Sequence, residues 1–131
     1  MAYDPADLPP EVQTFLAERH LASLTTLRPD GTPHVVAVGF TWDDDAGLAR
    51  VITFAHSRKA RNLAAHPGSP AALCQVDGGR WLTLEGTAVV TDDPERVEEA
   101  VRRYAERYRQ PGARADRVAI EVRVDRLLGR A

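Results

Sequence analysis

Apolar residues fall mostly in short runs along the chain, and this pattern predicts a mainly β protein. Strands are expected over 20–27, 33–42, 48–54, 70–76, 80–91 and 118–125. The runs are rich in Val, Ile, Leu and Thr, and the last of them alternates between apolar and polar positions, which is typical of strands. Asp30-Gly31 and Asp77-Gly78-Gly79 carry the residues of tight hairpin turns. We therefore expect consecutive strands to pair in an antiparallel arrangement.

Helices are expected over 9–18, 58–66 and 94–108. The first would place Val12, Phe15 and Leu16 on one face. Ser57 is a suitable N-cap for the second, and Asp93-Pro94 is a typical start for the third. The third helix has an apolar stripe of Val97, Val101, Tyr104 and Tyr108, with expected ion pairs Glu98–Arg102 and Glu99–Arg103 on its outer side.

The strand 33–42 differs from the others because neither of its faces carries a charged residue. One face holds Val36, Val38, Phe40 and Trp42, and the other holds Val35, Ala37, Gly39 and Thr41. A strand that is apolar on both faces needs a partner on each side. The small Ala37 and Gly39 would let a flat ligand or a subunit approach the backbone. We therefore predict an isologous homodimer.

Together these elements predict one domain over 1–131. Six strands, with one helix after the third and another after the fifth, favour a closed or partly closed antiparallel β-barrel whose helices cover its ends. Gly86 lies in the middle of the strand 80–91. It is expected to mark a bulge where the sheet bends.

Composition narrows the function more than the fold. The net charge of −2 gives no general attraction to nucleic acid or to a membrane surface. Cys74 is the single cysteine, which rules out an internal disulfide and fits a reducing cytoplasm. The first residues lack the basic and apolar regions of a secretory signal, and no apolar run is long enough to span a membrane. We expect a cytoplasmic protein.

No side-chain constellation for catalysis or metal binding stands out. The four histidines, His20, His34, His56 and His66, lack metal-ligand spacing. The acidic turn 43–45 lacks the alternating ligands of a calcium loop. An enzyme of this kind would depend on a bound redox cofactor for its chemistry.

The stretch 50–63 is the strongest candidate for binding an anion. An apolar strand there leads into a helix start, where backbone N–H groups and the helix dipole favour negative charge. Lys59 and Arg61 add two cations, and Asn62 adds a neutral donor. Lys59 is the one lysine among 17 basic residues, and lysine and arginine bind phosphate differently. The alternative is a solvated helix face that contains a lysine by chance.

Four stretches, 20–27, 33–40, 57–62 and 80–86, resemble in their residues and order the flavin and deazaflavin oxidoreductases of the pyridoxamine-phosphate-oxidase-like, FMN-binding split barrel. The similarity covers about 12–128. Within that superfamily the chain looks closest to the small actinobacterial F420-dependent reductases of the biliverdin-reductase type, on the further stretches 73–78, 104–109 and 120–122. The resemblance implies a six-stranded split β-barrel and a homodimer with the cofactor cleft at the subunit interface.

The resemblance also implies coenzyme F420 as the cofactor, with its phosphate at 57–62 and its ring against 35–38. The implied cofactor-binding residues are His34, Val35, Val36, Ala37, Val38, Thr53, Ser57, Arg58, Lys59, Arg61, Asn62, Gln75, Arg80, Trp81, Arg107 and Arg109. Arg114 and Arg117 are further candidates to meet the anionic oligoglutamate tail of F420. No side chain is assigned as catalytic, and no metal is expected.

The implied reaction transfers a hydride from reduced F420 to a conjugated small molecule, such as the tetrapyrrole biliverdin. The protein would supply position and electrostatics, while solvent or a nearby arginine supplies the proton. Two alternatives stay open. FMN also has a phosphate and a tricyclic ring, so an FMN-dependent oxidoreductase with the same barrel fits these residues. A non-enzymatic protein that binds a flavin, a haem or another tetrapyrrole would need the same cleft.

Overall fold

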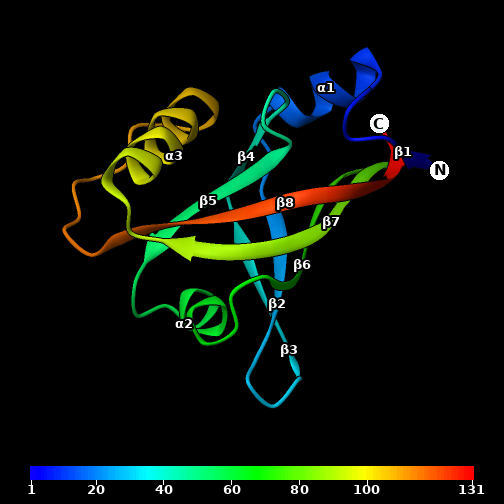
Figure 1. The fold of residues 1–131 in the computed structure, drawn as a ribbon. Helices are drawn as coiled ribbons and strands as arrows, with labels where there is room; N and C mark the ends of the chain where they lie inside the picture. The colour runs from blue at the N-terminus through cyan, green and yellow to red at the C-terminus, as the bar shows by residue number, and fades with distance from the viewer.

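The computed structural model describes all 131 residues (Figure 1). In chain order the elements are β1 Ala2–Tyr3, α1 Pro10–Ala17, β2 Ala22–Leu27, β3 Pro33–Val38, β4 Phe40–Asp43, β5 Leu48–Phe54, α2 Arg58–Ala65, β6 Ser69–Asp77, β7 Arg80–Thr91, α3 Pro94–Arg107 and β8 Arg117–Arg130. The three predicted helices and the predicted strands are all present, with ends that differ by a few residues.

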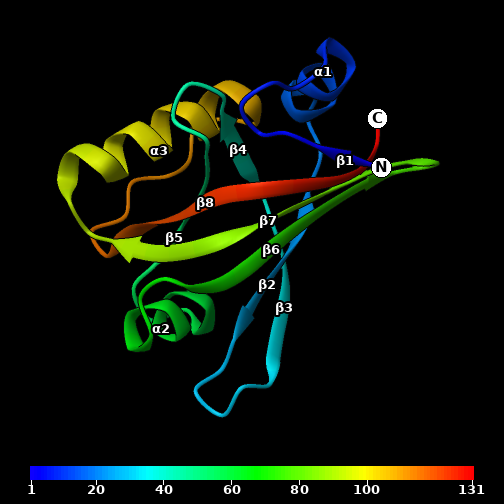
Figure 2. The ribbon, with the colours of Figure 1, turned by 45° about the vertical axis from the view of Figure 1, so that its right-hand side comes forward.

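The strands form one antiparallel sheet in the order β3-β2-β6-β7-β8-β5-β4, and β1 pairs with β8. The two edge strands, β3 and β4, are neighbours in the chain and are separated only by Gly39. Because one residue joins the two edges, the sheet must curl until they meet. Figures 1 and 2 show the resulting half-barrel, with α3 on one side and α2 on the other. The predicted antiparallel split barrel with flanking helices is confirmed.

The prediction of six strands is wrong in number, because the structure has eight. The predicted strand 33–42 is divided at Gly39. The N–H of Phe40 donates to the Tyr108 hydroxyl at 3.1 Å and not to a neighbouring strand. The two-residue strand β1 pairs Ala2 with Leu128 and Tyr3 with Leu127. A pairing this short leaves no periodic signal in the sequence. These differences alter the edges of the sheet and leave its centre as predicted.

The core lies inside the curl of the sheet and beneath α1. Its largest fully buried side chains include Phe15, Phe40, Leu24, Leu63, Leu73, Leu82, Leu84, Ile120 and Leu127. The predicted inner face of α1 is buried. The bulge at Gly86 is confirmed by a register shift in the β7–β8 pairing. A Cβ there would lie 1.9 Å from the carbonyl oxygen of Arg123, so the close approach of the strands requires glycine.

The outer surface of α3 carries ion pairs, although not all of those predicted. Glu99 pairs with Arg103 at 2.8 Å as expected. Arg102 turns to Glu99 at 2.8 Å and to Glu106 at 2.6 Å, and not to Glu98. In the whole structure no helix combines the length and the apolar character needed to cross a membrane.

Candidate functional site

A cavity of about 340 Å³ lies at the division between β3 and β4. It is lined by Ala37, Val38, Gly39, Ile52, Thr53, Phe54, Lys59, Tyr104, Arg109, Pro111, Gly112, Arg114 and Arg117. The walls therefore come from β3, β5, α2, α3 and the loop that leads into β8. Four of the lining side chains are cationic and none is a carboxylate. A concave site with one sign of charge attracts ligands of the opposite sign.

The four cations differ in what they already bind. Arg114 lies over the Phe54 ring, with its guanidinium carbon 4.1 Å from the ring centroid, and its Nε donates to Asp116 at 2.5 Å. Arg117 donates to the carbonyl of Gly112 at 2.8 Å. Lys59 and Arg109 have no hydrogen-bond or ion-pair partner in the protein. Lys59 and Arg109 are therefore free to bind an anion in the cavity, whereas Arg114 and Arg117 are already held by contacts within the protein.

The start of α2 fixes the position of Lys59. The Ser57 Oγ accepts the N–H of Ala60 at 3.3 Å, so the predicted N-cap is confirmed. The hydroxyl of Thr53 donates to the same oxygen at 3.1 Å and ties the end of β5 to the helix. Lys59 is the second residue of α2 and is half-buried. This burial lowers the pKa of its ammonium, because a desolvated charge is less stable.

His34 lies on β3 outside the cavity lining, close enough to Lys59, Arg58 and Arg28 to feel their charges. Its Nδ1 is buried and has no partner. Burial lowers the pKa of the imidazole, and the charges of Arg28, Lys59 and Arg58 lower it further. A neutral imidazole beside these cations is consistent with a region arranged for an anionic ligand, to which a ring nitrogen could donate.

The remaining residues of the predicted turn have separate positions. Asn62 is fully buried, and its Nδ2 donates to the hydroxyl of Thr26 at 3.0 Å, which braces α2 against β2. It does not line the cavity. Arg58 and Arg61 are exposed at the surface of the same helix. Of the five turn residues, Lys59 alone projects into the cavity wall.

Gly39 has no side chain, which lets the rings of Tyr104 and Tyr108 pack directly against the backbone at one wall of the cavity. A Cβ at this position would lie 3.1 Å from ring carbons of both Tyr104 and Tyr108. The two rings are stacked at a tilt, with centroids 4.9 Å apart. The sequence assigned Tyr104 only to the packing stripe of the helix, and in the structure it also lines the cavity. A tyrosine in a packing stripe gives no sign in the sequence that part of it reaches a ligand site.

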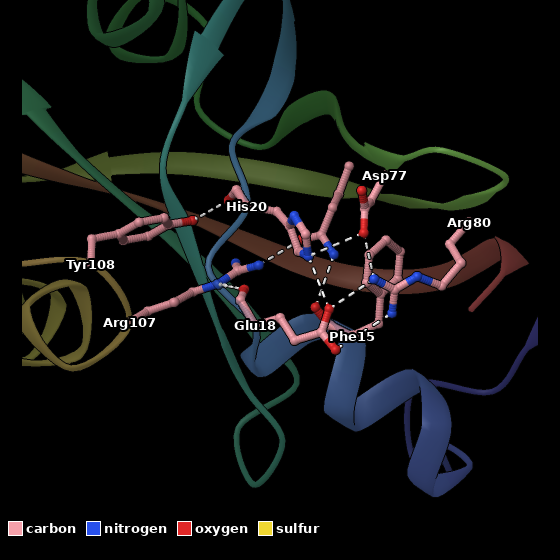
Figure 3. A network of polar contacts seen from close by, with 8 residues as sticks. Phe15, Glu18, His20, Asp77, Arg80, Arg107 and Tyr108 are labelled. Atoms are coloured by element: carbon pink, nitrogen blue, oxygen red, sulfur yellow. Dashed lines mark hydrogen bonds and ion pairs between the residues drawn. The ribbon is translucent and has the colours of Figure 1, made fainter.

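Four further predicted site residues, Gln75, Arg80, Trp81 and Arg107, also lie away from the cavity, and Arg80 and Arg107 are labelled in the network of Figure 3. Arg80 pairs with Glu18 at 2.9 Å and with Asp77 at 2.5 Å, and it lies over the Phe15 ring. Glu18, His20 and Asp77 could in principle hold a metal ion. Because Arg80 already neutralises both carboxylates, we interpret the cluster as an ion-pair network that joins α1 to the β6–β7 turn.

Arg107 and Gln75 form the other part of that network. The guanidinium of Arg107 donates to the carbonyls of Glu18 and Phe40 at 2.8 and 2.7 Å and to the Gln75 side chain at 2.7 Å. Both side chains are thus engaged within the chain. Trp81, the fourth residue, is 37% exposed at the start of β7. The structure does not bring these four residues to Lys59.

An apolar surface, here called the outer face, adjoins the cavity. It covers β3, β2, β6 and the start of β7, and comprises Leu21, Ser23, Val35, Ala37, Cys74, Val76 and Trp81. Leu21, Val35 and Val76 are about 60% exposed (63%, 59% and 60%). Ala37 belongs both to this face and to the cavity wall. Of the predicted ring-binding residues 35–38, Ala37 and Val38 line the cavity, whereas Val35 and Val36 do not.

Comparisons with known proteins show the family to which the chain belongs. The family described as pyridoxamine 5'-phosphate oxidase matches residues 8–130. The chain belongs to the pyridoxamine 5'-phosphate oxidase family. Among curated relatives of this family member is the F420H(2)-dependent biliverdin reductase of Mycobacterium tuberculosis (strain CDC 1551 / Oshkosh), which is 56% identical over 117 residues, 89% of this chain and 84% of the relative.

Solved structures share the fold of this pyridoxamine 5'-phosphate oxidase family member. A conserved hypothetical protein from Mycobacterium tuberculosis superposes with a TM-score of 0.75 and 26% identity, covering 94% of this chain and 84% of its own. A protein described as an F420 reductase superposes with a TM-score of 0.71 and 29% identity, covering 92% of this chain and 98% of its own. The family resemblance read from the sequence is confirmed.

Proposed function

We propose that this chain is an F420-dependent reductase that transfers a hydride from reduced deazaflavin to a conjugated small molecule such as biliverdin. The observation that carries the proposal is the 56% identity to an F420H(2)-dependent biliverdin reductase over 89% of the chain. An oxidoreductase of this kind needs no nucleophile–base pair of its own, because the cofactor supplies the redox chemistry. The lining of the cavity contains no such pair.

The residues of the cavity fit the charges of F420. The cofactor carries a phosphate and the carboxylates of its tail, and Lys59 and Arg109 are two cations without protein partners. The unpaired Nδ1 of His34 offers a further polar contact near Lys59. Ala37, Val38 and Gly39 present small or apolar groups, against which a flat ring can lie closely. We place the phosphate at Lys59 and the ring at this wall.

In this proposal the protein binds the cofactor, orients its ring and shields it from water. When bound, reduced F420 supplies the hydride. Lys59 holds the phosphate end through a charge-assisted contact, which fixes the distance of the ring from β3. Phe54 and Tyr104 reduce the access of water to the cavity. The proton that completes the reduction comes from solvent.

The proposal includes a homodimer that completes the cleft. The outer face is apolar, exposed and free of charged residues, and it shares Ala37 with the cavity. Exposed apolar surface of this kind favours association. A two-fold contact between outer faces would place a second subunit beside each cavity and would cover a ligand ring on its open side. A cytoplasmic location stays a prediction.

The proposal is tested by titrating purified protein with F420 and FMN, and then measuring biliverdin reduction with reduced F420. We expect F420 to bind and biliverdin to be consumed. Lys59→Ala should weaken F420 binding by about 1.5–3 kcal/mol, the range for a hydrogen bond to a charged group. Arg123→Ala, on the exposed side of β8, serves as the charge-matched control. Binding of FMN with turnover, and no binding of F420, would replace this proposal with an FMN-dependent enzyme of the same barrel.

A further inference from the structure

Lys59 has a chemical environment that its proposed role in holding a phosphate does not require. It is the single lysine of the chain, it is half-buried, and it has no carboxylate partner. Most lysines in proteins are exposed and fully protonated near neutral pH. In this cavity the amine is held at a defined place, at the start of a capped helix and at the wall of an open cavity.

The burial of Lys59 makes its uncharged, nucleophilic form easier to reach than that of an exposed lysine. Burial lowers the pKa of the amine. Arg109, Arg114 and Arg117 share the cavity with Lys59, and no carboxylate lines it that could pair with the amine. Desolvation is one means by which a lysine becomes a nucleophile toward carbonyl compounds.

We propose that the Lys59 amine forms a reversible imine with small anionic aldehydes, with phosphate-bearing aldehydes as the preferred class. The amine lone pair attacks the aldehyde carbon, and the resulting carbinolamine loses one water. One C=N bond replaces the C=O bond, and neither oxidant nor reductant is consumed. Arg109, which has no protein partner, binds the anionic group, and the cavity of about 340 Å³ has room for one small ring or a short chain.

The imine acts as a covalent competitor for the cavity. It removes the one ammonium at the wall and occupies the space next to Gly39. This consequence rests on the proposed function, because it matters only if the cofactor phosphate uses Lys59. The formation of the imine itself rests on the amine, the arginines and the absence of carboxylates in the cavity, and it does not require F420.

The test uses pyridoxal 5'-phosphate as the probe, borohydride to trap the imine, and intact-mass analysis with peptide mapping. The chain offers two amines, the α-amine of Met1 and the side chain of Lys59. Met1 is 84% exposed and serves as an internal control for non-selective reaction. We expect one adduct, on Lys59, at a level about tenfold above that with pyridoxal, because one charge-assisted contact is worth about that ratio.

Two variants separate chemistry from folding. Lys59→Arg keeps the charge and abolishes the adduct, and Arg109→Ala keeps the amine and reduces the preference for the phosphate-bearing probe. Equal modification of Met1 and Lys59, or equal modification by pyridoxal and its phosphate, would overturn the proposal. Protection of Lys59 by F420 supports both this inference and the proposed cofactor site. Adduct formation without protection supports this inference and counts against that site.

Discussion

The guanidinium of Arg107 donates to the side-chain oxygen of Gln75 at 2.7 Å, across 32 residues of chain. Gln75 is fully buried, and its own amide donates to the carbonyl of Phe15 in α1 at 2.9 Å. Arg107 also donates to carbonyls just after α1 and at the start of β4. Two side chains therefore connect α3 to α1, β4 and β6. They hold the end of α3, and with it Tyr104, against the division between the edge strands.

Replacement of Arg107 should destabilise the fold strongly. Arg107→Met leaves two carbonyls and the Gln75 oxygen without their charged donor, and unpaired buried acceptors cost about 1–3 kcal/mol each. Because these losses are not additive, we expect about 3 kcal/mol of lost unfolding free energy, measured by urea denaturation. Arg102→Met is the control on the exposed side of the same helix. It removes only the ion pairs of Arg102 with Glu99 and Glu106. Similar losses of unfolding free energy in both variants would show that Arg107 does not hold α3 in place.

Gly39→Ala tests the close packing of Tyr104 and Tyr108 against the cavity wall at Gly39. The new Cβ would lie 3.1 Å from the rings of Tyr104 and Tyr108, so the stacked pair must shift. We expect a loss of about 1–3 kcal/mol in unfolding free energy, as for overpacked sites, together with weaker cofactor binding. Calorimetry and a binding titration measure the two effects. Gly79→Ala, which lies away from the cavity and whose Cβ would meet only the Arg130 side chain at 3.9 Å, should change neither by comparable amounts.

The sequence was a good guide where local patterns decide the structure. The strand runs, the cap at Ser57 and the bend at Gly86 depend on residue type and nearest neighbours, and they were predicted. The division at Gly39 was not, because it arises from Tyr108, which lies 68 residues away. A long-range hydrogen bond that replaces strand pairing has no local signature, so the stretch 33–42 was interpreted as one strand.

The candidate site was predicted in part for the same reason. Lys59 stood out as the single lysine, and the structure does place it at a cavity with Arg109. The side chain of Asn62 was expected beside these cations, but its amide reaches the hydroxyl of Thr26 inside the barrel. The direction of a polar side chain on a short helix depends on which strand lies beneath it. That packing could not be read from the sequence of the helix alone.

Asp43 should contribute to stability in a pH-dependent way. It is buried, it accepts a hydrogen bond from Arg50 at 2.7 Å, and it forms an ion pair with Arg103 at 3.2 Å. Burial raises the pKa of this carboxyl, but the Arg50 hydrogen bond, the Ala46 amide and the nearby positive charges outweigh it, so the pKa falls below its ordinary value of 3.8. A carboxyl whose pKa is lowered by folding stabilises the protein above its unfolded pKa. That stabilisation is lost as the pH falls through the folded pKa.

The comparison of wild type with Asp43→Asn isolates this effect from other groups. We expect the difference in unfolding free energy between the two proteins to be constant from about pH 5 to 8 and to shrink below about pH 4. Urea denaturation at a series of pH values measures it. A difference that does not change with pH down to about 3 would show that Asp43 contributes through shape and not through charge.

The outer face should control the oligomeric state. Lysines in place of Val35 and Val76 would have to be buried without partners in a dimer, which is costly. We expect sedimentation to show a dimer for the wild type and a monomer for the double variant, with the fold retained because both positions are exposed. Ala65→Lys, at an exposed position on α2, should remain dimeric. A wild-type monomer at micromolar concentration would remove the shared cleft from the proposed function.

Arg109 should distinguish F420 from FMN. Both ligands have a phosphate for Lys59, but only F420 carries additional carboxylates, which need further cations. Arg109 has no protein partner, whereas Arg114 and Arg117 are held by Asp116 and Gly112. Each exposed charge contact is worth about 0–1 kcal/mol and is screened by salt. Arg109→Ala should therefore weaken F420 binding more than FMN binding. The triple variant that also lacks Arg114 and Arg117 should weaken F420 binding further. Added salt should reduce the effect of both variants on F420 binding. Isothermal titration at two ionic strengths measures this. If F420 and FMN lose affinity equally, the loop is a solvated surface and the tail of F420 binds elsewhere.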